Sequence, residues 1–508
     1  MSDERGTAKT GCGDLVVAVD CSTTASKAVV FDAHGHALSS GRRAFATSQP
    51  SPGRHEQDPQ DWWSATHAAL RESLSAIDPT RIAAVCVTTQ RETFVCLGDD
   101  NEPVMPGIVW MDTRARDLVE ELGTDVVHAM SGRPADNTPS MYKIAWLMRN
   151  EPDIMARVAK LGDVSAYLNM RLTGSWVTSH ASADSTGLLD MSTLHWSETL
   201  AATVGIDSAV FPGVVPPGAL IGVVSDEAAA LTGLARGTPV IAGAGDGQCA
   251  ALGAGLVDST SVYLNMGTAI VCGRPSVDYN WGRAYRTVAA AYGNTYLFEA
   301  FTASGTYLIN WFRENFEPKF HGTVDSAESD TELCAERIPP GSEALLALPY
   351  WNAAQTPHWD PKARGALIGL TGRHGRAHIY RAILEGIAFE IKLEMTGLDS
   401  ETEPIQQVFV TGGGSRSPLW MQIVADITGR PLTMCAEQET TALGAAMVAV
   451  VAVGLHPTME AATKAMTHHD RKVFPNPETT ARYDELWPIY RGLYDSLRPS
   501  LHALNAFA

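Results

Sequence analysis

The chain has 508 residues, 45% of them hydrophobic and 19% charged, and a formal net charge of -19. This length is too great for one hydrophobic core and predicts two or three domains. The acidic balance argues against nucleic acid or an anionic membrane surface as the main partner. The eight cysteines are scattered without a CxxC pair, which favours a reducing, cytoplasmic setting over a disulfide scaffold. No apolar run approaches the roughly 18 residues that a membrane span needs.

The first half of the chain begins with residues 1–13, which are polar and predict a disordered tail without a signal peptide. After the tail, strand-like runs alternate with helical stretches. Strands are expected at 15–19, 28–31, 85–89, 108–110 and 239–241, and helices at 61–76 and through much of 115–170. We expect a first domain over residues 14–257.

A second domain, over residues 258–508, is expected to repeat this order and to end in a helical extension. Its predicted elements are a hairpin at 261–272, helices near 304–316 and 376–396, a strand at 407–410, and helices near 417–428 and after Ala442. Strands that alternate with helices predict an α/β architecture.

One short turn occurs in both halves. Asp20-Cys21-Ser22-Thr23 follows the first apolar strand, and Asn265-Met266-Gly267-Thr268 follows the first strand of the second half. Each turn leads into another apolar run. Such hydroxyl-rich turns can aim backbone N–H groups at an anion, and phosphate is a suitable one. Two of them facing each other predict a nucleotide held between two related domains.

Two carboxylates stand at strand ends beside these turns. Asp246 lies in the Gly-rich segment 243–247, ahead of a helix, where it can accept a proton from a substrate hydroxyl. The alternative for Asp246 is a helix N-cap. Asp20 suits a magnesium ion bound through water, and its alternative is a turn-forming residue. Lys27 can reach a phosphate as a point charge, or it is a solvated surface residue.

Polar residues also close the next two strands. Gln90-Arg91-Glu92 follows the strand at 85–89, and Trp110 and Asp112 follow the strand at 108–110. An arginine can donate to sugar hydroxyls while a glutamate accepts from them, and an indole beside a carboxylate can hold a polyol. Each pair alone also fits an ordinary exposed ion pair with a half-buried tryptophan. Their clustering at consecutive strand ends favours a ligand site.

Together these motifs resemble the FGGY family of carbohydrate kinases, from about residue 15 to about residue 455. The most specific stretch is Gly365-Ala366-Leu367-Ile368-Gly369-Leu370, followed by His378-Ile379 and Ala382-Ile383-Leu384-Glu385. Glu56-Gln57-Asp58-Pro59 and Thr440-Thr441-Ala442-Leu443-Gly444-Ala445-Ala446 are similar as well. The family's other pattern, around Ser140 and Lys143, has the unusual Thr138 at its first position.

The resemblance implies a two-domain fold of the actin and hexokinase type (ribonuclease H-like), with ATP in the cleft between the domains and a possible homodimer. It makes Asp246 the catalytic base and associates Asp20 and Asp246 with Mg²⁺. The nucleotide-binding residues it implies are Thr23, Thr24, Lys27, Gly267, Thr268, Gly412, Gly413 and Ser417. The substrate-binding residues it implies are Gln90, Arg91, Glu92, Trp110, Asp112, Thr138 and Asp246.

The resemblance points to two different acceptors. Thr89-Gln90-Arg91-Glu92-Thr93 is similar to the substrate strand of glycerol kinases, and the Met-His pair of typical xylulokinases is missing. Thr138, Gly247 and Val271 are smaller than their counterparts in glycerol kinases, which predicts a roomier pocket. We therefore expect a four- or five-carbon ketose or polyol, as in xylulokinases. The alternatives are a glycerol kinase, a non-kinase actin-like ATPase, and a catalytically weak sugar sensor.

Overall fold

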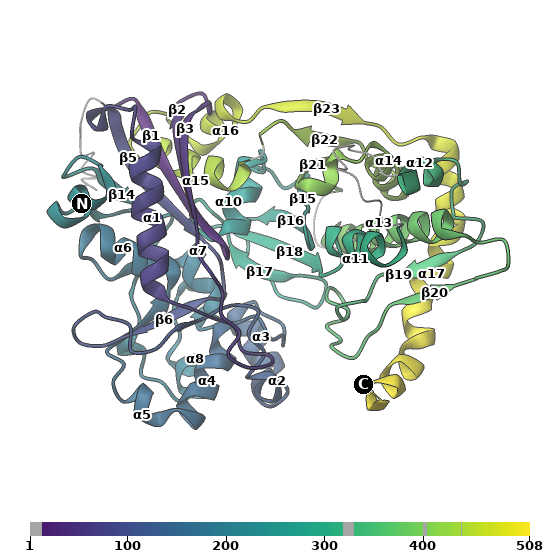
Figure 1. Cartoon of the computed structure of the whole chain (residues 1–508), viewed down its shortest axis with the longest axis horizontal. Coiled ribbons are helices and arrows are strands. Elements are labelled where there is room, and N and C mark those ends of the chain that lie inside the picture. The colour runs from purple at the N-terminus through teal and green to yellow at the C-terminus, as the bar shows by residue number, and fades with distance from the viewer. Residues whose placement is uncertain (1–12, 318–329, 400–403, 438, 508) are drawn as a thin grey trace.

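The structure is a computed structural model that describes residues 13–317, 330–399, 404–437 and 439–507. Two lobes lie side by side along the long axis, one built mainly from each half of the chain (Figure 1). The tail expected at 1–13 lies outside the described residues except for Gly13. Within the described ranges, no helix combines the length and the apolar character that crossing a membrane requires.

The first lobe is built on a six-stranded sheet with the order β13-β14-β5-β1-β2-β3. Its strands are β1 (Leu15–Cys21), β2 (Ala25–Asp32), β3 (Ala37–Ala44), β5 (Ile82–Thr89), β13 (Leu220–Val223) and β14 (Pro239–Ile241). Successive strand residues point to opposite faces. Along β1, Leu15, Val17 and Val19 therefore join one core cluster, whereas Val16 and Ala18 join another.

The second lobe is built on a seven-stranded sheet with the order β17-β18-β16-β15-β21-β22-β23. Its strands are β15 (Ser261–Met266), β16 (Ile270–Ser276), β17 (Arg286–Ala289), β18 (Tyr296–Thr302), β21 (Gln407–Thr411), β22 (Leu432–Cys435) and β23 (His469–Val473). Along β15, Val262, Leu264 and Met266 face one cluster and Tyr263 faces the other.

The two sheets share one central topology. In each, a hairpin (β1–β2 or β15–β16) pairs antiparallel with a third strand, β3 or β18, and parallel with a later strand, β5 or β21. The register sets Asp20 opposite Lys27 in the first hairpin and Asn265 opposite Val271 in the second. The repeat inferred from the two turns is thus confirmed, and so is the α/β architecture.

Each sheet is covered on one face by a helix from the other half of the chain. Helix α15 (Thr440–Ala452) packs against Val16, Ala18 and Cys86 of the first sheet, and α10 (Asp246–Gly253) packs against Tyr263, Leu297 and Phe409 of the second. The two helices cross at a pair of glycines. A Cβ on Gly253 would lie 1.9 Å from the Thr440 carbonyl oxygen, and one on Gly444 would lie 1.9 Å from that of Cys249.

The opposite faces carry helices from their own half (Figure 1). On the first sheet these are α1 (Pro59–Ser73), α6 (Val164–Thr173) and α9 (Asp226–Thr232). On the second sheet α13 (Arg376–Asp399) and α14 (Pro418–Thr428) lie against the strands, and α17 (Pro477–Leu504) joins the same core.

The remaining elements lie outside the two central sheets and the helices that cover them. A four-stranded sheet in the first lobe has the order β4-β7-β6-β8, with β4 (Glu56–Gln57), β6 (Phe94–Leu97), β7 (Gly107–Ile108) and β8 (Lys160–Asp163). The other helices are α2 (Arg116–Leu122), α3 (Asp125–Ser131), α4 (Ser140–Asn150), α5 (Pro152–Met155), α7 (His180–Ala183), α8 (Glu198–Val204), α11 (Thr306–Phe316), α12 (Asp330–Glu336) and α16 (Met459–Met466). The other strands are β9 (Val177–Ser179), β10 (Leu189–Asp190), β11 (His195–Trp196), β12 (Gly213–Val215), β19 (Leu346–Leu348) and β20 (Ala366–Ile368).

Candidate active site

Asp246 is the first residue of α10, and the helix N-cap is Gly245, without a capping side chain. The structure therefore does not support the N-cap alternative. The Asp246 carboxylate accepts a hydrogen bond from the Gly247 N–H at 2.7 Å and lies 3.3 Å from Arg91 Nε. Burial raises its pKa against the lowering effect of Arg91, and Glu92 and Glu299 add to the rise. Because 38% of this side chain stays exposed, the carboxylate remains reachable by a ligand.

Asp20 lies at the end of β1 on the face that Val16 and Ala18 turn toward α15. Its Oδ1 is buried and has no hydrogen-bond partner among the described residues. Burial, together with the charges of Asp246 and Glu439, raises the pKa of Asp20 to about 7, although Lys27 opposes the rise. A buried carboxylate held among like charges fits a nearby cation.

The fit to magnesium comes from this donor set. Asp20 offers a buried, unpartnered carboxylate oxygen, and Asp246 is close enough to raise its pKa. Oxygen donors from one or two carboxylates, completed by water and phosphate, suit Mg²⁺. In the described part of the chain no group of three or more His, Cys, Asp or Glu side chains is arranged to hold a metal ion, so water and phosphate would have to supply the other ligands.

The first hairpin presents Thr23, Thr24 and Lys27 beside this carboxylate. Thr23 is held from both sides, because its Oγ1 accepts from Trp110 Nε1 at 3.0 Å and its carbonyl accepts from Gln57 Nε2 at 2.6 Å. Thr24 is exposed at the tip. Lys27 Nζ lies 2.5 Å from Glu439 Oε1, a carboxylate that stands immediately before α15.

The second hairpin is fixed by the start of α11. The Gly267 carbonyl accepts from the Thr306 N–H at 2.9 Å, and the Thr268 carbonyl accepts from the Gly305 N–H at 3.0 Å. Thr268 itself is exposed. The two turns therefore have the same place in their sheets but different supports.

The glycine turn after β21 lies against the second hairpin. Gly412 has φ +88°, and a Cβ there would lie 2.5 Å from Asn265 Oδ1 and 2.7 Å from the Met266 carbonyl carbon. Glycine is required by both conformation and space. A Cβ on Gly413 would have room, since its nearest neighbour would be Arg416 Nη2 at 3.5 Å. Ser417 caps α14 by accepting from the Trp420 N–H at 3.1 Å, and it also donates to Glu332.

Three of the residues expected to bind the acceptor have their polar atoms engaged by neighbours. Gln90 is buried and donates to Gln57 Oε1 at 3.0 Å while its own oxygen accepts from Thr93. Asp112 accepts from the His55 N–H and from both the backbone and the guanidinium of Arg114. Thr138 donates to Asp136 at 2.7 Å, and its carbonyl accepts from Lys143 Nζ at 2.6 Å.

The other three, Arg91, Glu92 and Trp110, lie with Asp246 and the first hairpin. Trp110 is 37% exposed and bridges to Thr23. Glu92 has φ +58°, a strained left-handed conformation for a residue with a side chain, and such strain gathers at ligand sites. The structure thus brings Asp246, an arginine and a partly exposed indole to the first hairpin.

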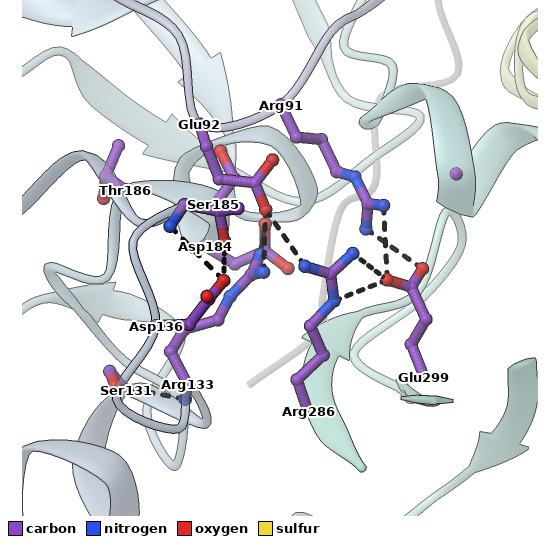
Figure 2. A network of polar contacts seen from close by, with 12 residues as sticks. Arg91, Glu92, Ser131, Arg133, Asp136, Asp184, Ser185, Thr186, Arg286 and Glu299 are labelled. Carbon is purple, nitrogen blue, oxygen red and sulfur yellow. Dashed lines mark hydrogen bonds and ion pairs between the residues drawn. The ribbon is translucent and has the colours of Figure 1, made fainter. Parts of the chain in front are cut away.

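Arg91 and Glu92 belong to a buried ionic network that joins the two halves (Figure 2). Arg91 donates to both carboxylate oxygens of Glu299 at 3.1 and 3.2 Å. Arg286 donates from Nε to the same carboxylate at 2.6 Å and lies 3.6 Å from Glu92. Arg133 donates to Glu92 at 2.9 Å. Glu299 and Arg286 are partners across β17 and β18.

Comparison with known proteins places this geometry in a family. The model of the FGGY carbohydrate kinase N-terminal domain matches residues 15–253, and that of the C-terminal domain matches residues 262–453. The chain belongs to the FGGY family of carbohydrate kinases. The predicted family, the predicted fold and the prediction of a carbohydrate kinase are confirmed, and ATP follows as the phosphoryl donor. The non-kinase actin-like ATPase is thereby set aside.

Relatives of this FGGY chain cover it almost end to end. A xylulose kinase of Lactococcus lactis is 30% identical over 97% of this chain and 99% of its own length. A glycerol kinase of Methylorubrum extorquens is 32% identical over 88% of this chain and 91% of its own length. The crystal structure of a ligand-bound xylulose kinase from Lactobacillus acidophilus superposes with a TM-score of 0.91 at 27% identity, covering 97% of this chain and 100% of that one.

Sequence reasoning missed four charged residues of this FGGY site: Arg133, Asp184, Arg286 and Glu299. A fifth, Glu439, sits beside the Thr440-Thr441 motif. Glu299 carried a usable signal in the sequence, because it is a single charge inside the apolar strand Tyr296–Thr302. In the structure it is 1% exposed. Buried charges are almost always paired. The partner could not be named, since Arg91 is far away in the sequence.

Proposed function

We propose that this enzyme transfers the γ-phosphate of ATP to a hydroxyl of a four- or five-carbon ketose or polyol, with a xylulokinase-like substrate as the first candidate. The observation that carries the proposal is Asp246, a partly exposed carboxylate of raised pKa between the arginine of the acceptor side and the Asp20 of the phosphate hairpin. The names of the xylulose kinase relatives support the same substrate class.

In the proposed mechanism Asp246 accepts the proton of the acceptor hydroxyl as its oxygen attacks the γ-phosphorus. A raised pKa suits this role, since a stronger base removes the proton more readily. Arg91 orients the acceptor, and Trp110 ties the acceptor side to Thr23 of the first hairpin. The backbone N–H groups of both turns and Lys27 receive the phosphates. Phosphoryl transfer depends mainly on this positioning and on charge stabilisation.

Magnesium belongs to the proposal, with Asp20 and Asp246 as its protein ligands through water. When bound, it offsets negative charge on the phosphates. A reducing cytoplasmic setting is proposed from the cysteines, all of which are free among the described residues. A homodimer is proposed from the family resemblance and is tested by light scattering coupled to size-exclusion chromatography.

The test of the base is Asp246→Asn, which keeps the size of the side chain but removes its basicity. We expect kcat to fall by about a hundredfold to ten-thousandfold, the range supplied by general bases, with KM for ATP little changed. Coupled ADP detection with the best acceptor measures this. Turnover close to that of the unmodified protein would rule out Asp246 as the base.

Glycerol remains the second candidate acceptor because Arg91 and Glu92 stand where glycerol kinases have the same pair. A panel of glycerol, erythritol, xylitol, D-xylulose, L-xylulose and D-ribulose separates the two proposals by kcat/KM. A strong preference for glycerol would overturn the larger acceptor.

A further inference from the structure

The ionic network of Figure 2, taken together with Asp246, has more carboxylates than guanidiniums on the acceptor side. Its cations are the guanidiniums of Arg91, Arg133 and Arg286. Each of them faces at least one carboxylate within the network, and the carboxylates are those of Glu92, Asp184, Glu299 and Asp246. Among the described residues of this network, every guanidinium is therefore already committed to an acid.

Arg91 is the guanidinium nearest to the base, and Glu299 decides where it points. Both Nη atoms of Arg91 donate to Glu299, and only Nε is left near Asp246. Burial raises the pKa of Glu299, but Arg286 and Arg91 lower it by more, to about 2. Arg286 and Arg91 thus keep Glu299 ionised, and its carboxylate engages both Nη atoms of Arg91.

The space for this ion pair comes from a missing side chain. Gly247 follows the base, and a Cβ there would lie 2.8 Å from Arg91 Nη2 and 3.2 Å from Glu299 Oε2. Its φ is not in the left-handed region, and it lies in the first turn of α10. Glycine at 247 is therefore explained by room for Arg91 and not by backbone conformation.

A carboxylate on the acceptor would find all three guanidiniums of this network already paired with acids. The ammonium of Lys143 is fully buried and donates to the Thr138 carbonyl at 2.6 Å. Moving an anion out of water is costly unless a cation or several donors receive it. An added anion would also be repelled by the surplus carboxylates. Hydroxyl groups have no such cost, because they carry no charge and can donate to Asp246 and Glu92.

We propose that Glu299 is a positioning residue that determines acceptor specificity: by occupying Arg91 from the second half of the chain, it reserves the site for uncharged ketoses and polyols and excludes sugar acids. This inference rests on the proposed function and narrows its substrate class. It assigns a role on the acceptor side to a residue of the second, nucleotide-binding half.

The test compares acceptors of the same chain length in which one terminal carbon is either a neutral hydroxymethyl group or a carboxylate. The pairs are xylitol with D-xylonate and erythritol with D-erythronate. D-xylulose is added as a further neutral acceptor and D-gluconate as a further sugar acid. The unmodified protein should phosphorylate the neutral member of each pair at least about a hundredfold better in kcat/KM, as expected for an unpaired buried charge. An aldonate that equals or exceeds its neutral partner would overturn the inference and leave the kinase function standing. No acceptor-dependent ADP release with any member would overturn both.

Two variants separate positioning from general damage. Glu299→Gln frees Arg91, so the ratio of aldonate to polyol turnover should rise at least about tenfold, with a higher KM for the neutral acceptor and an unchanged KM for ATP. Gly247→Ala displaces Arg91 without changing any charge, so it should raise the acceptor KM while the ratio stays low. A ratio that does not move in Glu299→Gln would refute the role of Glu299.

The matched control is Glu385→Gln. Glu385 is also a buried glutamate of the second half paired with an arginine, Arg381, but it lies on α13 away from the acceptor side. Its loss should lower stability and leave the aldonate to polyol ratio unchanged. The same change of ratio in both variants would show that the ratio reports stability and would contradict the proposal.

Discussion

At the scale of single residues, the site is defined by what each polar atom already contacts. Asp246 and Asp112 both follow strands and both looked suited to a ligand from the sequence. The structure separates them, because Asp112 accepts from His55 and Arg114 whereas Asp246 keeps 38% of its side chain exposed. Ligand binding is therefore expected of Asp246, while Asp112 holds its loop.

Lys27 gives a prediction at this scale. Lys27→Ala removes the ammonium group that pairs with Glu439 at 2.5 Å beside the first hairpin. We expect KM for ATP to rise roughly tenfold to a hundredfold, because a charge-assisted contact contributes about 1.5–3 kcal/mol. KM for the acceptor should change little.

Initial rates at varied ATP measure the effect. Lys392→Ala is the control, since Lys392 also pairs with a carboxylate, Asp484 at 2.6 Å, on the far helices α13 and α17. An unchanged KM for ATP in Lys27→Ala, or an equal change in the control, would contradict the assignment.

Local sequence was enough to single out Asp246, the two hairpins and Arg91, because each lies at a strand end marked by glycine or hydroxyl residues. It was not enough for their supports. Arg114 lies two residues from Asp112 and could have been noticed. Glu299, however, meets Arg91 only through the tertiary fold, and Gln57 meets Gln90 in the same way. Long separation along the chain hides such partners from any reading of motifs.

At the scale of elements, strongly periodic segments and the short strand at 239–241 were predicted well, but other short strands were not. The helices expected at 376–396 and 417–428 appear as α13 (Arg376–Asp399) and α14 (Pro418–Thr428). Within the largely helical stretch 115–170, however, Lys160–Asp163 forms β8. Its pairing with β6 is the reason, since a four-residue strand is specified by its partner more than by its own pattern.

Helix α13 carries a buried carboxyl that predicts a pH dependence of stability. Glu390 accepts from Tyr350 at 2.9 Å and from Tyr490 at 2.6 Å, and burial raises its pKa to about 7. The unfolded chain releases this proton near its ordinary value of 4.5. Between pH 4.5 and 7 the folded state binds more protons, so stability is lost as the pH rises.

Glu390→Gln should remove this loss, because the amide keeps an acceptor oxygen for the two tyrosines and has no charge. At about 1.4 kcal/mol for each pH unit, the variant should gain up to about 3 kcal/mol relative to the unmodified protein between pH 5 and pH 8. Urea unfolding at both pH values measures this. Equal pH dependence in the two proteins would contradict it, and Glu485→Gln, on the exposed side of α17, is the control.

At the scale of the whole molecule, neither half is complete by itself. The first sheet depends on α15 from the second half, and the second sheet depends on α10 from the first. A boundary at residues 257 and 258 remains a prediction. The sequence predicted two related halves, but not this exchange of helices, because the pattern of a buried helix does not say which sheet it covers.

Separate expression of residues 14–257 and 258–508 tests the exchange. Each fragment alone should aggregate, because the sheet face that the missing helix covers would expose a large apolar patch. Expressed together, the two should form a soluble one-to-one complex. Size-exclusion chromatography and cooperative unfolding measure the outcome.

The control for this experiment is the full chain with a protease site inserted after residue 257 and cut after folding. It should keep the elution volume and the melting temperature of the uncut protein. A monomeric fragment that unfolds cooperatively without its partner would contradict the dependence.

The crossing of α10 and α15 at their glycines also bears on how the two repeats are related. If the chain were divided between its two repeats, each copy would send one helix onto the sheet of the other. That is the arrangement of a domain-swapped dimer, a low-cost route by which two identical chains associate. The present molecule has the form of such a dimer joined into one polypeptide.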